Sequence, residues 1–415
     1  MGHGACDERA WGMSIAIALH LQGKRVLIIG GGAVALRKAR QFADEQALVT
    51  VLAPSFIPAF DALAVQRISA GYARVCLRGY LLVYAASDDA ELNAQIVQDA
   101  GEEGILCGSA TQCARATFTS MRQADAQTYT LALSTHAHAI ALGGQMLADA
   151  QASIDARHGS RLALLAFLHE AMGERYGPIR ALLSRMEEEK LALFADMLRK
   201  GKVQVFVFHG TDSPRALAHL RQTFQGSGAD HVRCFCFASR RVIVRCPQVL
   251  SLDELTAFVK AASGLLAVHV QLAFVQRRQL YAQAKDALSA LGEIAPFWLD
   301  EEALEEMVRY AEQKASKARC LFITHHPFAQ LSAMAKAHGA LCLSLRDPLP
   351  AVQGEIMLFP VFMTYGEHVR NDLFAGECSI VAALRGRGCT VLAHDQALSE
   401  QEWAIRRLLT LPACT

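Results

Sequence analysis

A glycine-rich run near the start of the chain has the residue types and spacing that bind a phosphate. Gly30, Gly32 and Ala35 form a G-x-G-x-x-A pattern directly after the apolar run Val26–Ile29 and before a stretch of helical periodicity. The first glycine permits a tight turn, the second lets the backbone approach a pyrophosphate, and the small third residue lets helix and strand pack closely. The helix start adds amides and a positive dipole end. We therefore predict a dinucleotide site, with a turn that only packs a helix as the alternative.

The residue that would select between dinucleotides is not evident. In such units an acidic residue at the end of the second strand binds the ribose 2′-hydroxyl of NAD. Here the second expected strand, Val49–Ala53, is followed by Pro54, without an Asp or Glu. The choice between NAD and NADP therefore stays open at this stage.

Histidines in loops that follow apolar runs form the second group of residues that can do chemistry. His368 follows the run Ile356–Met363, and His325 and His326 follow Cys320–Ile323. Neutral imidazole binds divalent iron, cobalt and nickel, and it accepts protons near its own pKa. A lone histidine is more often structural, but polar loops at two strand ends favour a shared site. We therefore predict metal chemistry at these loops.

The elements around the glycine run alternate between strand and helix patterns. This order predicts βαβ units with a parallel sheet, and hence an α/β Rossmann domain over residues 13–115. The expected strands are Lys24–Ile29, Val49–Ala53, Leu81–Ala86 and Gly104–Cys107, and the expected helices are Ala33–Ala43 and Ala90–Gly101.

Three further segments follow. Residues 116–150 contain an expected strand, Tyr129–Leu133, and a small-residue helix, and residues 151–200 are helical in pattern. Residues 202–415 predict two similar α/β halves, because a strand that ends in His209 is echoed by the later strand that ends in His325. With 415 residues the chain is too long for one typical core, so several domains are expected.

Bulk composition excludes several classes of protein. The 41 basic and 40 acidic residues leave a net charge of +1, which gives no support to nucleic-acid binding. No uninterrupted apolar stretch is long enough to span a membrane, and the polar, acidic N-terminus does not resemble a signal peptide. The 12 cysteines contain no Cys-x-x-Cys pair. They are expected to be small buried side chains in a reducing cytoplasm, and the protein is expected to be cytoplasmic.

The first part of the chain resembles a known family. The run Gly23–Ala39, the strand end Thr50–Pro54, and Ala85–Asp89 with Asn93 resemble the N-terminal module of siroheme synthase, the precorrin-2 dehydrogenase family. The resemblance covers residues 13–200 and implies oxidation of precorrin-2 to sirohydrochlorin with NAD, in a homodimer formed through a dimerisation segment, 116–150. The cofactor-binding residues that it implies are Gly30, Gly31, Gly32, Ala33, Val34, Ser87 and Asp88, with Asp89 nearby.

One departure bears on the oxidation step. The family has an Asp, held to be important in catalysis, shortly after the fourth strand, and Thr111 stands at that place here. A threonine cannot act as a carboxylate base at neutral pH. His136 and His138 are candidates for the missing proton chemistry, and histidines at a dimer surface are the alternative. Cofactor binding is therefore better supported than a normal rate of oxidation.

The last part of the chain resembles the anaerobic sirohydrochlorin cobaltochelatase family, a class II chelatase. The match is best over Ile356–Asp372, fair over Leu321–His326 and faint over Val205–Ser213, and it spans residues 202–412. It implies that His325 and His368 are the metal-binding and catalytic pair for insertion of Fe²⁺ (siroheme) or Co²⁺ (corrin). His326 replaces a glycine of the family and is a further candidate ligand, which either helps or hinders metal binding. His209 does not match a family histidine, so its loss is expected to matter less.

Basic residues replace acidic ones in this part. Where relatives place acids in the cleft, this chain has Gln276-Arg277-Arg278 and Ser344-Leu345-Arg346-Asp347, so Asp347 is the only nearby carboxylate offered as a third ligand. The arginines either face the carboxylates of sirohydrochlorin or are simply solvated. The leading interpretation is a bifunctional enzyme of tetrapyrrole biosynthesis. The alternatives are a tetrapyrrole- or nucleotide-binding protein with degenerate sites, which Thr111 and Arg277-Arg278 favour, and an unrelated nucleotide-dependent oxidoreductase.

Overall fold

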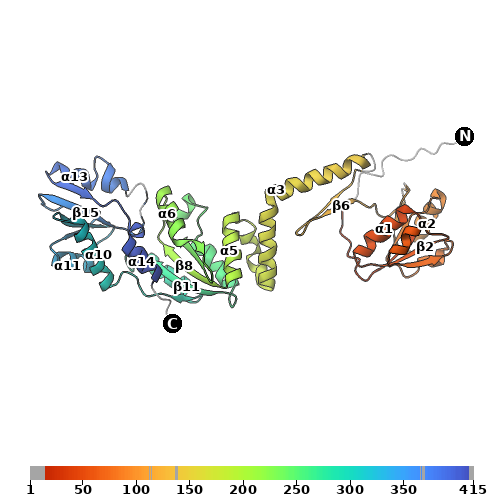
Figure 1. Ribbon diagram of the computed structural model, residues 1–415, viewed down its shortest axis with the longest axis horizontal. Coiled ribbons are helices and arrows are strands. Elements are labelled where there is room, and N and C mark those ends of the chain that lie inside the picture. The colour runs from red at the N-terminus through yellow and green to blue at the C-terminus, as the bar shows by residue number, and fades with distance from the viewer. Residues whose placement is uncertain are drawn as a thin grey trace. The chain divides into compact units, whose positions relative to one another are not determined.

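The computed structural model describes residues 15–111, 113, 115–135, 139–364, 366 and 370–410 (Figure 1). The chain forms two compact units, Met1–Arg157 and His158–Thr415. The division falls within the long helix α3, Ile140–Met172. Each unit has hydrophobic cores of its own, and each is taken by itself below.

The first unit contains a five-stranded sheet in the order β3-β2-β1-β4-β5, and every neighbouring pair is parallel. The central strand β1 is apolar and buried after its first residue, as expected for a strand that is covered on both faces. This order is that of a Rossmann fold, and the chain changes direction between β1 and β4. The strands are β1 Arg25–Ile29, β2 Leu48–Ala53, β3 Gln66–Ser69, β4 Leu82–Ala85 and β5 Leu106–Ser109.

Two helices cover the faces of this sheet. Helix α1, Ala33–Asp44, starts directly after Gly32 and buries Leu36 and Phe42 in one core. Helix α2, Ala90–Glu102, buries Ile96 and Val97 in the core of the other face. Two short 3₁₀ helices, η1 Pro58–Ala62 and η2 Arg74–Leu77, complete the connections. The predicted α/β class and parallel sheet are therefore confirmed.

An antiparallel hairpin precedes α3. Its strands are β6, Arg122–Asp125, and β7, Thr130–Leu133. The hydroxyl of Tyr129, in the turn, donates to the Asp155 carboxylate at 2.6 Å, so the hairpin is bonded to the following helix. The sequence predicts β7 but not β6, because the residues of β6 are largely polar and exposed.

A helical segment opens the second unit and packs on its first sheet. It consists of the end of α3, then η3 Gly173–Ile179, α4 Arg180–Leu183 and α5 Glu188–Lys200. The sequence predicts a boundary at residue 200. The structure instead places buried side chains of this segment, such as Phe194, in one core with the first strand of the following sheet, so the segment belongs with that sheet.

Apart from the two-residue antiparallel edge strand β9, the two remaining sheets share one strand order. In the first, β12-β11-β8-β10-β9, the strand that comes first in the chain after the helical segment, β8, lies in the middle. In the second, β14-β13-β15-β16, the first strand, β13, is again internal, with the next strand on one side and the third on the other. The two similar α/β halves expected from the sequence are thus confirmed. The strands are β8 Lys202–Phe208, β9 Gly226–Ser227, β10 Val232–Phe237, β11 Ala267–Ala273, β12 Glu293–Ile294, β13 Arg319–Thr324, β14 Leu341–Ser344, β15 Glu355–Val361 and β16 Thr390–Ala393.

Helices connect these strands and cover their faces. In the first half they are α6 Pro214–Phe224, α7 Arg240–Arg245, α8 Leu252–Ala261 and α9 Gln279–Ser289. The connecting helix α10 is Glu301–Ala315. In the second half they are α11 Ala329–Ala337, η4 Asn371–Ala375, α13 Ile380–Gly386, η5 Leu398–Glu400 and α14 Glu402–Thr410.

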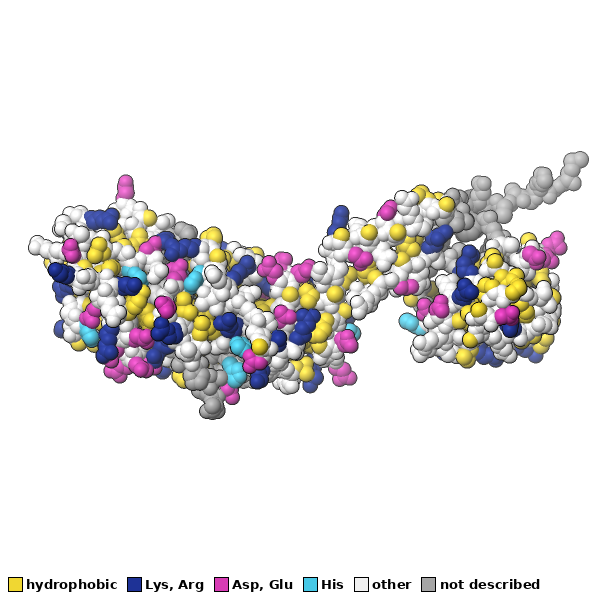
Figure 2. All heavy atoms as spheres, in the orientation of Figure 1, with side chains coloured by type: hydrophobic (Ala, Val, Ile, Leu, Met, Phe, Trp, Pro, Cys, Tyr) yellow, Lys and Arg dark blue, Asp and Glu magenta, His cyan; other side chains and the backbone are white. Residues whose placement is uncertain are grey.

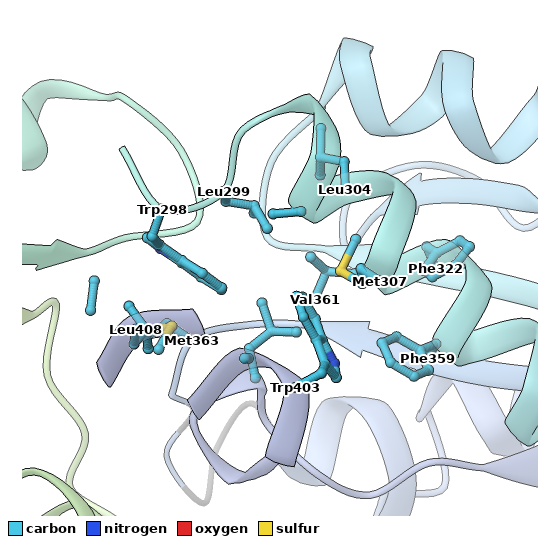
Figure 3. Close-up of a cluster of buried hydrophobic side chains, with 14 of the residues drawn as sticks. Trp298, Leu299, Leu304, Met307, Phe322, Phe359, Val361, Met363, Trp403 and Leu408 are labelled. Atoms are coloured by element: carbon cyan, nitrogen blue, oxygen red, sulfur yellow. The ribbon is translucent and has the colours of Figure 1, made fainter. Parts of the chain in front are cut away.

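One hydrophobic core joins the two halves. Trp298 and Trp403 lie with their ring centres 6.2 Å apart, and Arg407 donates to the Trp298 carbonyl at 3.0 Å. Figure 3 shows these rings beside side chains of α10 and of the second sheet. Because this core holds both sheets, the position of one set of strand ends relative to the other is fixed by packing. Its labelled members are Trp298, Leu299, Leu304, Met307, Phe322, Phe359, Val361, Met363, Trp403 and Leu408.

Charge on the molecular surface is mixed. Basic and acidic side chains are interspersed over the face shown in Figure 2, in keeping with the net charge of +1. Among the helices of the described residues, none is long and apolar enough to cross a membrane.

Candidate cofactor crevice and histidine cleft

The glycine turn lies at the point where the strand order of the Rossmann sheet reverses, between β1 and β4. Gly30 follows β1 with φ +137°, a conformation that L side chains rarely adopt, and a Cβ there would overlap the Ala86 carbonyl. A Cβ at Gly31 would overlap the carbonyl of Ser55. Gly32, at the start of α1, has open space beside it. The backbone is therefore closely packed at the first two glycines and accessible at the third, as a pyrophosphate site requires.

Ser87 lies across the crevice, directly after β4. Its backbone N–H donates to Asn93 Oδ1 at 3.0 Å, and Asn93 Nδ2 donates back to the Ser87 carbonyl at 2.9 Å. Asp89 caps α2, because its carboxylate accepts from the amides of Glu91 and Leu92. Asp88 is exposed at the same strand end. The residues implied to lie near the cofactor thus meet at one edge of the sheet.

Thr111 extends this network at the end of β5. Its Oγ1 lies 3.1 Å from Ser109 Oγ and 3.5 Å from Asn93 Nδ2. The network consists of hydroxyl and amide groups, which can relay a proton but cannot hold one at neutral pH as a carboxylate does. His136 and His138 lie outside the described residues.

The histidine loops lie at carboxyl ends of the two further sheets. His209 directly follows β8, and His325 and His326 directly follow β13. In each sheet the strand order reverses beside one of these strands: between β8 and β11 in the first sheet, and between β13 and β15 in the second. Ligands of open α/β sheets bind at such points.

Hydrogen bonds hold the loops of the two halves together. Gln276 Nε2, after β11, donates to the His326 carbonyl at 3.4 Å, and Thr324 Oγ1 donates to the same carbonyl at 2.7 Å. Thr364 Oγ1, after β15, donates to the Gly210 carbonyl at 3.3 Å, beside His209. The two sets of strand ends therefore lie side by side, and the site that they would form together is called the histidine cleft below.

The protein environment lowers the pKa of the imidazoles and so favours their neutral form. Burial lowers the pKa of His325, and the charges of Arg346 and Arg278 lower it further. Burial also lowers the pKa of His326, as do His325 and the same two arginines. At His209, burial again lowers the pKa, a backbone hydrogen bond opposes the shift, and His325 contributes to it. Neutral imidazole is the form that binds a metal ion and accepts a proton.

The structure changes the interpretation of His209. The sequence predicts a minor role, because His209 matches no family histidine, yet it lies within electrostatic range of His325 in the same cleft. The sequence does contain a signal for this role. The strand before His209 and the strand before His325 have similar patterns, which places the two histidines at equivalent strand ends.

The other predicted metal ligands are His368 and Asp347. His368 lies outside the described residues, as does most of its loop. Asp347 Oδ2 accepts from the Ser344 amide at 2.7 Å, so one carboxylate oxygen closes a local turn. Within the described part of the chain, no group of three or more His, Cys, Asp or Glu side chains converges on one point.

Comparisons with known proteins bear on part of the chain. Residues 17–121 match a sequence family described as "Putative NAD(P)-binding". The siroheme synthase of Azotobacter vinelandii is 45% identical over 91 residues, 21% of this chain and 19% of that protein. That of Pseudomonas putida W619 is 32% identical over 217 residues, 51% and 41% of the two chains. That of Chromobacterium violaceum is 28% identical over 218 residues, 52% and 44%. The chain is thus similar in part to siroheme synthases.

These matches have limited extent. The chain spans less than half the length of these curated relatives. A solved structure, "SirC, precorrin-2 dehydrogenase", covers 44% of this chain and 87% of its own, with 20% identity and a TM-score of 0.34, and it adds no argument at that distance. The likeness to siroheme synthases supports the resemblance of the first part. The chelatase resemblance of residues 202–412 stays a prediction.

Proposed function

We propose that this protein carries out two consecutive steps of tetrapyrrole biosynthesis. The first unit oxidises precorrin-2 to sirohydrochlorin with NAD, and the second inserts Fe²⁺ or Co²⁺ into the product. Support for the first step comes from the likeness to siroheme synthases together with the open glycine turn. The observation that carries the second step is the contact between strand-end loops of the two halves, which brings His209 and His325 together, and burial lowers the pKa of both.

In the first step, the backbone of residues 30–34 would hold the pyrophosphate at the start of α1, with Ser87 and Asp88 beside it. When bound, NAD supplies the hydride acceptor. The residues of the crevice must then remove one proton from the substrate. Thr111, Ser109 and Asn93 offer only neutral groups for this, so they would pass the proton to solvent rather than hold it.

In the second step, the metal ion is a substrate. Its insertion releases two protons from pyrrole nitrogens, and a neutral imidazole can either bind the incoming ion or accept one of these protons. We assign these roles to His325, with His209 and His326 beside it and His368 as the family resemblance implies. Two or three imidazoles with few carboxylates suit iron and cobalt alike, so the metal is not assigned.

A homodimer is proposed as well. The hairpin β6–β7 is a sheet of only two strands, which is marginally stable by itself. Leu142 and Met146 of α3, in the same unit, expose 52% and 45% of their surface. Pairing with a second copy would cover both features. Sedimentation of the full chain tests this, and a monomer at micromolar concentration would contradict it.

One absorption experiment tests the two steps. Purified protein is mixed with precorrin-2 and NAD, and Fe²⁺ or Co²⁺ is added after the first spectral change ends. We expect the spectrum of sirohydrochlorin, followed by that of the metallated ring. Tetrapyrrole binding without any spectral conversion would instead support a binding protein with degenerate sites, the alternative that Thr111 favours.

A substitution at Thr111 distinguishes a slow oxidation step from an absent one. Thr111→Asp restores a carboxylate next to Ser109 and Asn93, and it should raise the rate of oxidation because the base can now hold the proton. Thr111→Asn, of similar size but without a base, is the matched control. An equal rate in both variants would mean that no base is needed at this position.

A further inference from the structure

Two arginines flank the histidines of the cleft, one from each half. Arg278 follows Gln276, whose amide bonds to the His326 carbonyl at 3.4 Å. Arg346 follows Leu345, whose backbone N–H donates to the Thr324 carbonyl at 2.8 Å, directly before His325. Both guanidinium groups are exposed, and both lie within electrostatic range of His325 and His326.

These two arginines differ from several neighbours because, among the described residues, no carboxylate pairs with them. Arg240 pairs with Asp253 at 3.0 Å, Arg245 pairs with Asp212 at 3.0 Å, and Arg370 pairs with Asp395. In the part of the chain that the structure describes, no ion pair joins Arg278 or Arg346 to an acidic side chain. Each therefore keeps a full positive charge and all its donors available.

The charge of the free cleft follows from these contacts. The two guanidinium groups are positive, and the nearby Asp347 carboxylate closes its own turn. Two positive charges near the imidazoles repel a divalent cation that approaches the empty cleft. The same charges attract a ligand with several carboxylates, because guanidinium forms paired hydrogen bonds with a carboxylate.

We propose that Arg278 and Arg346 impose an order of binding, in which the polycarboxylate tetrapyrrole enters first and the divalent metal second. This inference rests on the proposed function of the second unit. Sirohydrochlorin carries eight carboxylates, so two of them can neutralise the arginines while the others lower the potential around the imidazoles. The metal ion then meets a cleft that no longer repels it. A protein with acidic side chains in the same cleft would bind the free metal instead.

The order of binding predicts that a single substitution changes the affinity for sirohydrochlorin and the affinity for Co²⁺ in opposite directions. Arg278→Gln and Arg346→Gln each remove a partner of a carboxylate, so each should weaken sirohydrochlorin binding by roughly 5- to 30-fold. Each also removes a repulsive charge, so each should strengthen binding of Co²⁺ to the protein without tetrapyrrole by a few-fold. A loosened fold would weaken both affinities, so the opposite signs exclude a merely structural effect.

Two further variants isolate charge from geometry. Arg346→Lys keeps the positive charge but loses the planar guanidinium, which can form two hydrogen bonds with one carboxylate. It should therefore leave Co²⁺ affinity low while weakening tetrapyrrole binding. Arg309→Gln is the control, because Arg309 pairs with Glu305 along α10 at a position that contributes nothing to the cleft histidines. It should change neither affinity.

The experiment uses the full-length, metal-free protein. Sirohydrochlorin binding is followed by absorption at low and high salt, and Co²⁺ binding is measured by calorimetry without tetrapyrrole. We expect wild-type protein to bind sirohydrochlorin with a strong salt dependence and to bind Co²⁺ weakly. If wild-type protein does not bind sirohydrochlorin, the proposed function of the second unit fails and this inference fails with it. If it binds but the Gln variants leave both affinities unchanged, only the order of binding is overturned.

Discussion

Gly31 and Gly32 are adjacent, but their surroundings differ. A Cβ at Gly31 would overlap the Ser55 carbonyl, whereas a Cβ at Gly32 would meet nothing within 4 Å. Gly31→Ala should therefore destabilise the first unit, because backbone must move to accommodate it. Gly32→Asp should leave the fold intact and weaken NAD binding, because a carboxylate would occupy the place of the pyrophosphate.

Calorimetric titration with NAD and thermal unfolding test this pair of variants. We expect at least a tenfold loss of NAD affinity in Gly32→Asp with a nearly unchanged Tm. Gly32→Ala is the matched control, since its methyl group fits the open space without adding charge. Equal NAD affinity in Gly32→Asp and wild-type protein would mean that the cofactor does not bind at this turn.

Lys38 is buried in the first unit. Its Nζ donates to Gln41 Oε1 at 2.8 Å and lies 5.2 Å from the centre of the Tyr84 ring. Burial, followed by the charge of Arg37, lowers the pKa of Lys38 from 10.5 to about 8. Between these two values the unfolded chain binds more protons, so this lysine makes folding less favourable below pH 8, and the penalty fades as the pH rises to 10.5.

Replacement of Lys38 should therefore stabilise the first unit. Lys38→Met removes a penalty on the order of 3 kcal/mol, less the lost contacts with Gln41 and Tyr84. Unfolding of full-length protein at pH 7 and at pH 10 should show a gain that is larger at pH 7. Lys200→Met, at an exposed helix end, is the control and should show no such difference. A gain of the same size at both pH values would contradict the lowered pKa.

At the residue scale, the sequence predicts the glycine turn and the His325 loop because both depend on local order, a strand followed by its loop. The meeting of His209 with His325 depends on how the two halves pack. That packing is set by side chains far apart in the chain, such as Trp298 and Trp403. No local pattern around His209 contains this information.

At the element scale, the helical segment 158–200 contributes to the core of the following sheet. The Phe194 ring of α5 stacks on Phe258 of α8 at 3.8 Å, and the buried Lys190 pairs with Glu254 at 2.9 Å. Valines of β8 lie in the same core. Removal of the segment would expose this apolar face and leave Glu254 without its partner.

Two fragments test this packing. A fragment 158–415 should fold, and a fragment 202–415 should aggregate, although the sequence pattern alone predicts that 202–415 folds by itself. In the full chain, Phe194→Ala should destabilise the second unit by about 3–5 kcal/mol, because a large cavity forms. Phe167→Ala, partly buried nearby, is expected to have a smaller effect. A soluble, cooperative fragment 202–415 would show that α5 is dispensable.

The strands also show which elements a sequence pattern detects. The apolar, buried strands such as β1 and β4 are predicted to within one residue. The edge strand β3 is exposed throughout and the hairpin strand β6 is polar, so neither carries an apolar signal. Pro360 lies inside β15 beyond the last residue paired with β16, where its missing N–H breaks no bond to that strand.

At the scale of the whole molecule, the two halves of the second unit have one strand order apart from the edge strand β9, with a histidine after the corresponding strands β8 and β13. One half presents His209 and Arg278, and the other presents His325 and Arg346. A repeated fold thus brings together strand-end loops to which each half supplies an imidazole and a guanidinium. The cofactor crevice belongs to the other compact unit.

The two proposed sites should therefore work independently. Gly32→Asp should abolish oxidation of precorrin-2 but not metal insertion into supplied sirohydrochlorin, and His325→Ala should do the reverse. Loss of a metal ligand or proton acceptor typically lowers activity about a hundredfold. A mixture of the two variants should then convert precorrin-2 to the metallated product, because sirohydrochlorin made by one chain can diffuse to the other.

The mixture is compared with each variant alone and with wild-type protein by absorption. We expect full conversion with a lag, since the intermediate must first accumulate in solution before it reaches a functional cleft. Conversion that stops at sirohydrochlorin would show that the intermediate must pass within one chain. Full insertion by His325→Ala alone would instead place metal insertion in the first unit, and the cleft between the two halves would then need another function.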